Sequence, residues 1–297
     1  MSNYLNNKFG KKNSFKNTCE KKLLFKPLLK KIRIKIVDVY NLDFLKNWLT
    51  RIFVYKFDFV FNSDSPNYLL FNSFGIEHKK HSYDNTVKIA FYTENIIPDL
   101  NEVDYAIGHS HINYLDRYFQ YPLLLKRDYG IIEEKRKKVL KNPIRKKFCA
   151  AVISNAYSSD NFRIKVIKEL SKYKNIDMGG RFGNNIGFKV KDKISFLNSY
   201  KFSIAMENSD GDGYSTEKLI HSFISGTIPI YYGDYMIDEY INPKSYILIK
   251  GEKDLQEKIK YIISIDNNDE IYKSILKEKV IIDVNLSNKL LLLREIL

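Results

Sequence analysis

The stretch Phe202 to Ile220, FSIAMENSDGDGYSTEKLI, contains the pattern that decides the fold. An apolar run ends at Met206, a polar loop with two glycines follows, and a helical pattern opens at Ser215 and Thr216. Their hydroxyls suit a helix N-terminus. A second apolar run follows at 227–232 (TIPIYY). Strand, loop, helix and strand in this order indicate a Rossmann-like parallel sheet, in which ligands bind where strands end and helices begin.

The same alternation extends along the rest of the chain, which predicts an α/β protein with two parallel sheets. In the first half we expect strands at 31–40, 53–61, 68–71, 86–92 and 105–107, with a helix at 42–52. In the second half we expect strands at 148–154 and 201–206 and helices at 161–172, 191–200, 252–265 and from 269 to the end.

Two shifts in composition divide the chain. Residues 1–30 are rich in Asn, Lys and Ser and predict a basic, poorly structured lead-in. Between 130 and 147 the sequence becomes highly charged around Pro143, which indicates a linker or, equally, a solvated helix face followed by a turn. We therefore expect an N-terminal domain over 31–145 and a C-terminal domain over 146–297.

The composition is that of a globular protein, with 44% hydrophobic and 28% charged residues in 297. The net charge of +14 predicts an anionic partner, which can be nucleic acid, an acidic membrane surface or a phosphate-bearing small molecule. Lys supplies most of this charge, whereas Arg is the residue that reads bases and phosphates bidentately. Specific recognition of nucleic acid is therefore not expected.

Cys19 and Cys149 lie far apart and form no CxxC or Cys/His spacing, so neither a disulfide framework nor a structural zinc site is expected. No apolar run approaches the roughly 18 residues needed to span a bilayer. Charges interrupt every apolar patch near the N-terminus, which disfavours a signal peptide. These features predict a cytoplasmic protein.

The loop before residue 215 suits an anion, because the first N–H groups of a helix lack backbone partners and carry positive partial charge. Lys218 can add a full charge to the same anion, and Glu217 can accept hydrogen bonds from ribose hydroxyls. Taken alone, the pattern also fits a capped helix with ordinary surface charges.

Several motifs in one order resemble the α-1,3-fucosyltransferases. The segments 202–220 and 226–233 (GTIPIYYG) resemble the donor-binding signature of that family. The motifs FYTEN, DYAIG and DRYFQYPL, at 91–95, 104–108 and 116–123, resemble the acceptor-side motif of its bacterial members. Ser154-Asn155 with Arg163, and Gly179-Gly180, resemble two further family segments.

The resemblance implies a GT-B enzyme, in which two Rossmann-like domains face a cleft. The acceptor binds on the N-terminal side and GDP-fucose on the C-terminal side. L-Fucose would pass, with inversion of its anomeric centre, to a hydroxyl of N-acetylglucosamine or glucose in a glycan, with O3 the expected position. Such a reaction needs a carboxylate to accept the proton and cations to stabilise the leaving diphosphate.

The resemblance also assigns roles to individual residues. Glu94 is the expected general base, although the extra glycine of close bacterial relatives is missing before it. The expected donor-binding residues are Arg163 and Lys218 at the diphosphate, with Asn208, Tyr214 and Glu217, and Gly179 and Gly180 as a possible donor-site turn. The possible acceptor-binding residues are Tyr92, His109 and Tyr118. On their own, His109 and His111 fit loop or surface positions, and the tyrosines fit core packing.

The sequence Asp210-Gly211-Asp212 spells the D-x-D of metal-dependent glycosyltransferases. A GT-B site replaces the metal with Arg, Lys and a helix N-terminus, so no metal site and no essential cofactor are expected. The expected partners are GDP-fucose and an oligosaccharide acceptor. The alternatives are a GT-B transferase for another nucleotide sugar and a basic nucleic-acid-binding protein. Lysine clusters at 21–22, 30–31, 135–138 and 145–147 suggest peripheral contact with the anionic inner face of the cytoplasmic membrane.

Overall fold

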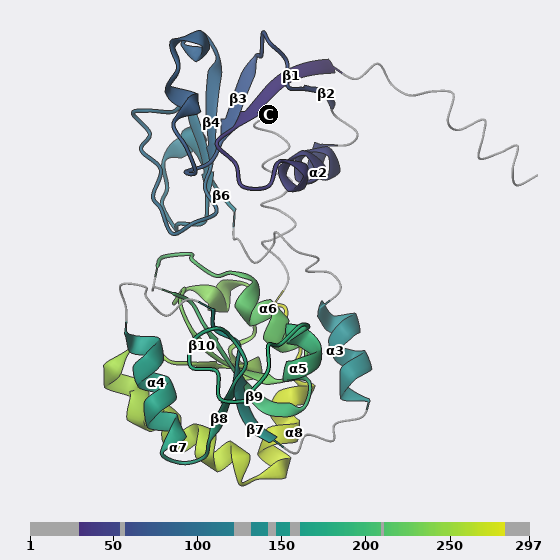
Figure 1. Ribbon diagram of the computed structural model, residues 1–297, viewed down its shortest axis with the longest axis vertical. Helices are drawn as coiled ribbons and strands as arrows, with labels where there is room; N and C mark the ends of the chain where they lie inside the picture. The colour runs from purple at the N-terminus through teal and green to yellow at the C-terminus, as the bar shows by residue number, and fades with distance from the viewer. Residues whose placement is uncertain are drawn as a thin grey trace, which may run out of the picture.

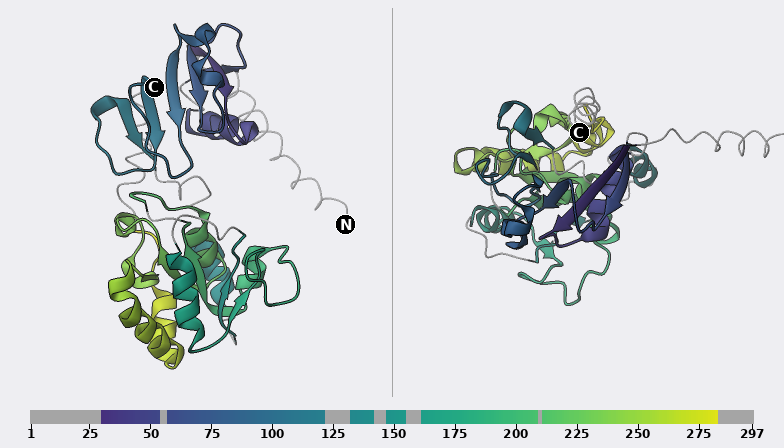
Figure 2. Two further views of the ribbon diagram at one scale, coloured as in Figure 1. Left: turned by 60° about the vertical axis from the view of Figure 1, so that its left-hand side comes forward. Right: turned by 90° about the horizontal axis from the view of Figure 1, so that it is seen from above.

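The computed structural model describes residues 30–53, 57–121, 132–141, 147–154, 161–208 and 211–282. These residues form two lobes, each built on a parallel sheet, which Figures 1 and 2 show one above the other. The predicted class, α/β with two parallel sheets, is confirmed. Residues 1–29 of the predicted lead-in, the end of the C-terminal helical pattern, Asn155, Asp210 and residues 145 and 146 of the basic cluster lie outside the described residues, whereas Lys147 is described.

The N-terminal sheet has the strand order β2-β1-β3-β4-β5-β6. Its strands are β1 (Lys30–Val37), β2 (Phe57–Phe61), β3 (Tyr68–Phe71), β4 (Val87–Phe91), β5 (Tyr105–Gly108) and β6 (Tyr118–Gln120). Alternate side chains enter two cores because successive residues of a strand point to opposite faces. Leu70 packs with helix α2 (Leu42–Phe53) on one face, whereas its neighbours Leu69 and Phe71 pack on the other.

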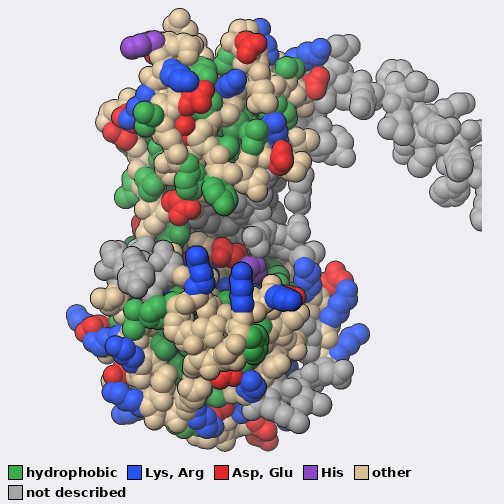
Figure 3. Space-filling model, viewed as in Figure 1, with side chains coloured by type: hydrophobic (Ala, Val, Ile, Leu, Met, Phe, Trp, Pro, Cys, Tyr) green, Lys and Arg blue, Asp and Glu red, His purple; other side chains and the backbone are tan. Residues whose placement is uncertain are grey.

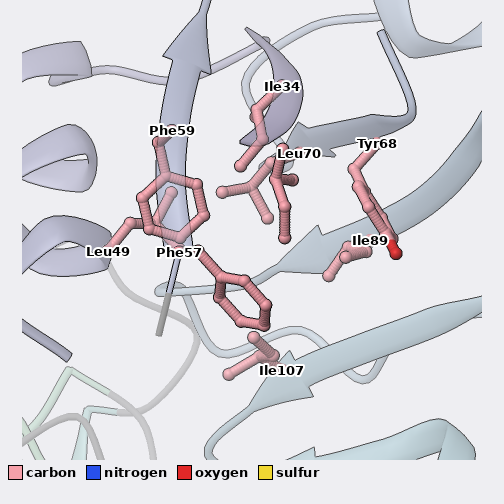
Figure 4. A pocket seen from close by; sticks show the side chains of 9 residues that line it. Ile34, Leu49, Phe57, Phe59, Tyr68, Leu70, Ile89 and Ile107 are labelled. Carbon is pink, nitrogen blue, oxygen red and sulfur yellow. The ribbon is translucent and has the colours of Figure 1, made fainter. Parts of the chain in front are cut away.

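An apolar pocket lies in the core between this sheet and α2, and Figure 4 shows side chains from both converging on it. Aliphatic and aromatic residues line it, namely Ile32, Ile34, Leu49, Phe57, Phe59, Tyr68, Leu70, Ile89 and Ile107. A nucleotide sugar needs charged and hydrogen-bonding partners, and this lining has no charged group. The pocket is therefore a feature of the core and not the candidate site.

The C-terminal sheet has the order β11-β10-β9-β7-β8. Its strands are β7 (Lys147–Ala151), β8 (Ile176–Met178), β9 (Tyr200–Met206), β10 (Ile228–Tyr232) and β11 (Ile247–Leu248). Helices α4 (Phe162–Ser171), α7 (Glu252–Asp266) and α8 (Asp269–Lys277) cover one face, and α3 (Ile132–Leu140), α5 (Lys193–Leu197) and α6 (Glu217–Ile224) cover the other (Figure 1). Among the described residues, no helix is both long and apolar enough to cross a lipid bilayer.

Within the charged stretch at 130–147, which the sequence reads equally as a linker or as a solvated helix and a turn, the structure has helix α3, and this helix is partly buried. Its Ile132 is fully buried in the core that contains α6, and its Arg136 is 2% exposed. Arg136 donates hydrogen bonds from Nη1 to the carbonyl of Glu278 and from Nη2 to that of Ile275, at the end of α8. Among the described residues, α3 therefore already packs on the C-terminal lobe, ahead of the expected division at residues 145 and 146.

Candidate functional site

The candidate site lies where strand ends of the two sheets face each other. The N-terminal lobe contributes the loop after β4, residues 92–97, here called the Glu94 loop, and the residues after β5. The C-terminal lobe contributes the described part of the loop between β9 and α6, residues 207–216, here called the glycine loop. The carboxyl ends of parallel strands are the usual place for ligands in open α/β sheets.

The glycine loop touches the N-terminal lobe through its two glycines. A Cβ atom on Gly213, which has a φ of 78°, would lie 1.8 Å from the carbonyl oxygen of His109. A Cβ on Gly211 would lie 2.5 Å from Oδ1 of Asn95. At Gly213 only glycine allows so close an approach to backbone and so easily adopts this φ, whereas at Gly211 the Asn95 side chain would have to move. These two residues therefore let the lobes meet at the site.

Glu207 and Lys218 form the buried centre of the C-terminal half. Glu207 is 0% exposed, and its carboxylate accepts from the Thr216 backbone N–H at 2.7 Å and from the Thr216 hydroxyl at 2.8 Å. Lys218 Nζ donates to the same carboxylate at 2.5 Å and to the Thr216 hydroxyl at 2.9 Å. The sequence analysis assigned Lys218 to the anion but did not identify Glu207 as its partner.

Burial controls the ionisation of the two glutamates here. It raises the pKa of Glu207 above its ordinary value, and Lys218 and Thr216 offset part of that rise. Burial also acts to raise the pKa of Glu217, but the charge of Lys218 and a backbone hydrogen bond outweigh it, so the pKa is lowered. Glu217 is therefore an ionised acceptor at the first residue of α6, suited to hydroxyl groups.

Arg163 lies on the other flank of the C-terminal half. It is 4% exposed, on the second residue of α4, and its Nη1 donates to Oδ1 of Asn208 at 2.9 Å. Asn208 follows β9 directly after Glu207. The structure thus brings together two residues that are 45 positions apart and that were both expected to bind the donor.

Tyr214 connects the two halves of the site. Its ring packs edge-on against the His109 ring, with 5.2 Å between centroids. Burial raises the pKa of the Tyr214 hydroxyl, and the charges of Glu207, Glu94 and Glu217 raise it further. The Tyr214 hydroxyl therefore stays protonated, close enough to Glu94 on one lobe and to Glu207 and Glu217 on the other to be affected by their charges.

Glu94 is exposed at the end of β4, and its backbone is well held. Its carbonyl accepts hydrogen bonds from His109 Nε2 at 3.0 Å and from the Ile96 N–H at 2.7 Å. The carboxylate is thus free to meet solvent or a substrate while its main chain is fixed.

His109 differs from both expectations, a surface position and contact with the acceptor. It is 1% exposed, with Nε2 facing the Glu94 carbonyl and Nδ1 facing the Asp212 carbonyl at 3.3 Å. Burial lowers its pKa. A neutral imidazole has one N–H, so His109 donates to one of the two loops at a time. It holds these two loops in place and leaves little exposed surface for contact with an acceptor.

Tyr118 also differs from the expected acceptor contact. It is 6% exposed in the core, and its hydroxyl donates to the Ser110 carbonyl at 3.0 Å. Burial raises its pKa. Tyr92 lies two residues before Glu94 and is only partly buried, so an acceptor could still contact it. Burial raises the pKa of Tyr92, and the charge of Glu102 raises it further.

Gly179 and Gly180 follow β8 and pack against the end of β7. A Cβ on Gly180 would lie 1.9 Å from the Ile153 carbonyl oxygen, and one on Gly179 would lie 2.5 Å from the Val190 side chain. Their contacts explain why this turn requires small residues. A donor contact at the turn stays a prediction.

Three further residues belong to the site: Ser215, expected as a helix-opening hydroxyl, His111, expected in a loop or at the surface, and Asp234, which the sequence analysis did not identify. Ser215 is 0% exposed, and its hydroxyl has no hydrogen-bond partner among the described residues. Asp234 is 1% exposed after β10, and its Oδ1 accepts from the Gly213 N–H at 3.1 Å. His111 Nε2 lies 3.4 Å from Asp234 Oδ1. Burial acts to lower the pKa of His111, but the carboxylate of Asp234 outweighs this effect, so the pKa is raised. The polar loop following the predicted 227–232 strand was the available signal for Asp234.

Comparisons with known proteins agree with this arrangement. Residues 142–289 match the family model described as glycosyltransferase family 10 (fucosyltransferase), C-terminal. Residues 34–126 match the N-terminal domain of the alpha-(1,3)-fucosyltransferase FucT.

Individual relatives span a wide range of organisms. The chain is 30% identical over 240 residues to the alpha-(1,3)-fucosyltransferase FucT of Helicobacter pylori, covering 70% of this chain and 50% of that protein. It is 31% identical over 152 residues to the human 4-galactosyl-N-acetylglucosaminide 3-alpha-L-fucosyltransferase 9, covering 50% and 41%. The chain thus spans half or less of the length of these relatives.

Solved structures bear on the fold. A crystal structure of an alpha1,3-fucosyltransferase superposes with a TM-score of 0.76 at 24% identity, covering 91% of this chain and 90% of the other. Another, of an alpha1,3-fucosyltransferase with GDP-fucose, gives 0.74 at 22% identity and 91% coverage of each chain. This likeness confirms the predicted GT-B fold class. The two family models cover both lobes, and the chain belongs to glycosyltransferase family 10, the fucosyltransferases.

Proposed function

We propose that this chain is an inverting fucosyltransferase that moves L-fucose from GDP-fucose to a hydroxyl, O3 of N-acetylglucosamine or glucose, in a glycan acceptor. The observation that carries the proposal is an exposed carboxylate, Glu94, on one lobe and two cations on the other, Arg163 bonded to Asn208 and Lys218 bonded to Glu207, the two residues that follow β9. Family membership and the GDP-fucose complex of a structural neighbour support this donor.

The carboxylate of Glu94 supplies the base for the reaction. It accepts the proton of the acceptor hydroxyl as that oxygen attacks the anomeric carbon of fucose from the face opposite the nucleotide. The bond from the anomeric carbon to the diphosphate oxygen breaks, and GDP leaves. Inversion follows from this single displacement.

The C-terminal half stabilises the departing charge. Lys218 Nζ has three N–H donors and uses two of them for Glu207 and Thr216, which leaves one for a phosphate oxygen. Arg163 presents a fork of donors suited to two phosphate oxygens. With two cations and the first N–H groups of α6, the chemistry needs no divalent metal.

The remaining residues complete the proposed contacts. Asn208, Tyr214 and Glu217 would bind the phosphate, sugar and ribose of the donor, and the Gly179-Gly180 turn would border it. On the acceptor side, Tyr92 is the remaining candidate. Figure 3 shows Lys and Arg side chains along the edge of the lower lobe that faces the upper one, which favours an anionic donor there.

Product analysis tests the proposal. The protein is incubated with GDP-fucose and with lactose, N-acetyllactosamine or a type-1 chain, and the fucosylated product and its linkage are identified. A thermal-shift titration separates the alternatives: GDP at 100 times its Kd should add about 2.7 kcal/mol of stability. A larger response to UDP would indicate another nucleotide sugar, and salt-sensitive binding of single-stranded DNA without a GDP response would indicate a nucleic-acid-binding protein.

Peripheral contact with an anionic membrane is a further part of the proposal, together with a cytoplasmic location. Lys30, Lys31, Lys135, Lys137 and Lys138 are exposed and can approach lipid phosphates. Flotation with vesicles that contain or lack phosphatidylglycerol tests the contact, and equal recovery from both kinds of vesicle would contradict it.

A further inference from the structure

Three side chains able to ligate a metal meet beside the glycine loop. His111 follows β5 in the N-terminal lobe, Asp212 belongs to the glycine loop, and Asp234 follows β10. One ligand atom from each lies within 4.8 Å of the other two. We infer that this cluster binds a divalent cation that links the two lobes.

The distances fit ligands of one ion better than a direct hydrogen bond. His111 Nε2 lies 3.4 Å from Oδ1 and 3.5 Å from Oδ2 of Asp234. An N–H···O bond is usually about 2.7–3.2 Å long. Two ligands each about 2.1 Å from a metal, at tetrahedral or octahedral angles, are separated by roughly 3.0–3.4 Å.

The oxygen Oδ1 of Asp212 points to the same conclusion. It is buried and has no hydrogen-bond partner among the described residues, which is costly for a carboxylate oxygen. Asp234 is oriented by two backbone N–H groups, those of Gly213 and Met236, which both donate to its Oδ1. A cation between the two carboxylates and the imidazole would satisfy the unpaired oxygen.

The surroundings hold the imidazole and favour positive charge. Gln120 lies 2.7 Å from His111 Nδ1. The Gln120 atom that faces Nδ1 is its amide nitrogen, which also donates to the His109 carbonyl at 3.4 Å. Exchange of the amide oxygen and nitrogen on metal binding would let Gln120 accept an Nδ1–H and leave the Nε2 lone pair for the ion. The charges acting on His111 include those of Asp234, Asp212 and Glu239, and all three are negative.

The donor set selects the kind of ion. One imidazole nitrogen and two carboxylate oxygens suit Zn²⁺ or Mn²⁺ better than Mg²⁺ or Ca²⁺, which prefer oxygen ligands throughout. The ion would fix the glycine loop against the N-terminal lobe. The proposed site uses one Asp of the D-x-D sequence, Asp212, and two ligands from distant segments, His111 and Asp234. The D-x-D sequence by itself therefore does not define the site.

Metal titration tests the inference without reference to transfer activity. The protein is stripped with a chelator and dialysed, and Zn²⁺, Mn²⁺ and Mg²⁺ are titrated by calorimetry and followed by thermal unfolding. The variants are His111→Gln and Asp212→Leu, with His81→Gln as a matched control because His81 is an exposed histidine paired with Asp84. Circular dichroism of each stripped variant checks its folding, and GDP binding is measured separately.

We expect one Zn²⁺ or Mn²⁺ per chain, a rise in Tm, and binding at least tenfold tighter than that of Mg²⁺. His111→Gln and Asp212→Leu should each weaken binding at least tenfold, while His81→Gln leaves it unchanged. Absence of binding to the parent protein at millimolar metal would overturn the inference. So would binding that neither cluster variant weakens, since the ion would then lie elsewhere.

Discussion

On the C-terminal side of the site, Glu207 is fully buried and bonded to Thr216 and Lys218, whereas on the N-terminal side Glu94 is exposed with only its backbone held. Both carboxylates follow a parallel strand. The difference lies in what surrounds them: a loop and a helix start in one case, an open loop in the other. The side proposed to bind the donor is therefore fixed by its own contacts, whereas the side proposed to bind the acceptor exposes its carboxylate.

Exposed apolar residues extend this contrast. Ile97, the last residue of the Glu94 loop, is 67% exposed, whereas Ser215 in the glycine loop is fully buried. An exposed apolar side chain near the proposed base suits the face of a sugar ring. Changes on the donor side should therefore affect both stability and binding, and changes on the acceptor side should affect turnover alone.

The largest effect is expected for Glu94→Gln. Removing the proton acceptor should lower kcat by ~10²–10⁴, because general-base catalysis is lost while the exposed side chain keeps its shape. GDP affinity should stay at the parent value. Glu102→Gln is the matched control, since Glu102 is half-exposed on the same lobe and paired with Lys79. Steady-state kinetics and GDP calorimetry check both, and near-normal turnover would place the base elsewhere.

Lys218→Met should lower stability and donor affinity together. The buried charge of Glu207 loses its partner, at a cost of about 3 kcal/mol by denaturant unfolding, and the donor KM should rise. This differs from the expectation that the side chain serves the anion alone. The double variant with Glu207→Gln should regain stability and not donor affinity. Recovery of both would remove Lys218 from the donor site.

A change in the C-terminal core should affect stability alone. Burial acts to raise the pKa of Asp266, but Lys174, Lys201 and Tyr173 outweigh it, so the pKa is lowered. Its ionised form therefore stabilises the fold above the ordinary carboxyl pKa, and this stabilisation is lost as pH falls through the lowered value.

Asp266→Asn should cost about 2 kcal/mol at neutral pH and less in acid, with both KM values unchanged. Unfolding measured at pH 7 and pH 3 checks this, with the exposed neighbour Asp269→Asn as control. An equal loss at both pH values would show that charge is not the cause.

The smallest effect is expected for Ile97→Ser. Loss of apolar contact should raise the acceptor KM about fourfold, the equivalent of one buried methylene, without change in donor KM or stability. Ile76→Ser, equally exposed on the same lobe, should change neither constant. A shift in donor KM would mean that the two sides are not separate.

The sequence predicted the contiguous parts of the molecule well. Segments such as 68–71 and 252–265 match β3 and α7 because their periodicity reflects the face they bury. The short strands β6, β8 and β11 were missed, since two or three residues show no period. The burial of α3 was hidden because Ile132 and the charged Arg136 are the buried residues among the described side chains of a highly charged helix.

Candidate site residues could be predicted from the sequence where they lie in one motif, and not where residues from distant segments come together only in the fold. Asn208, Tyr214 and Lys218 stand in a single string, so their neighbourhood follows from the chain itself. His111 and Asp234 are 123 positions apart and come together only when the two sheets meet. The burial of His109 depends likewise on the glycine loop that covers it.

The buried guanidinium of α3 has a practical consequence for dividing the protein. A fragment that starts at residue 146 would lack Arg136 and leave the carbonyls it serves, those of Ile275 and Glu278, without that donor. It would also lack Glu133, whose carboxylate accepts from the Val280 N–H at 2.7 Å. An autonomous C-terminal half for crystallisation or nucleotide soaking should therefore be cut ahead of Ile132.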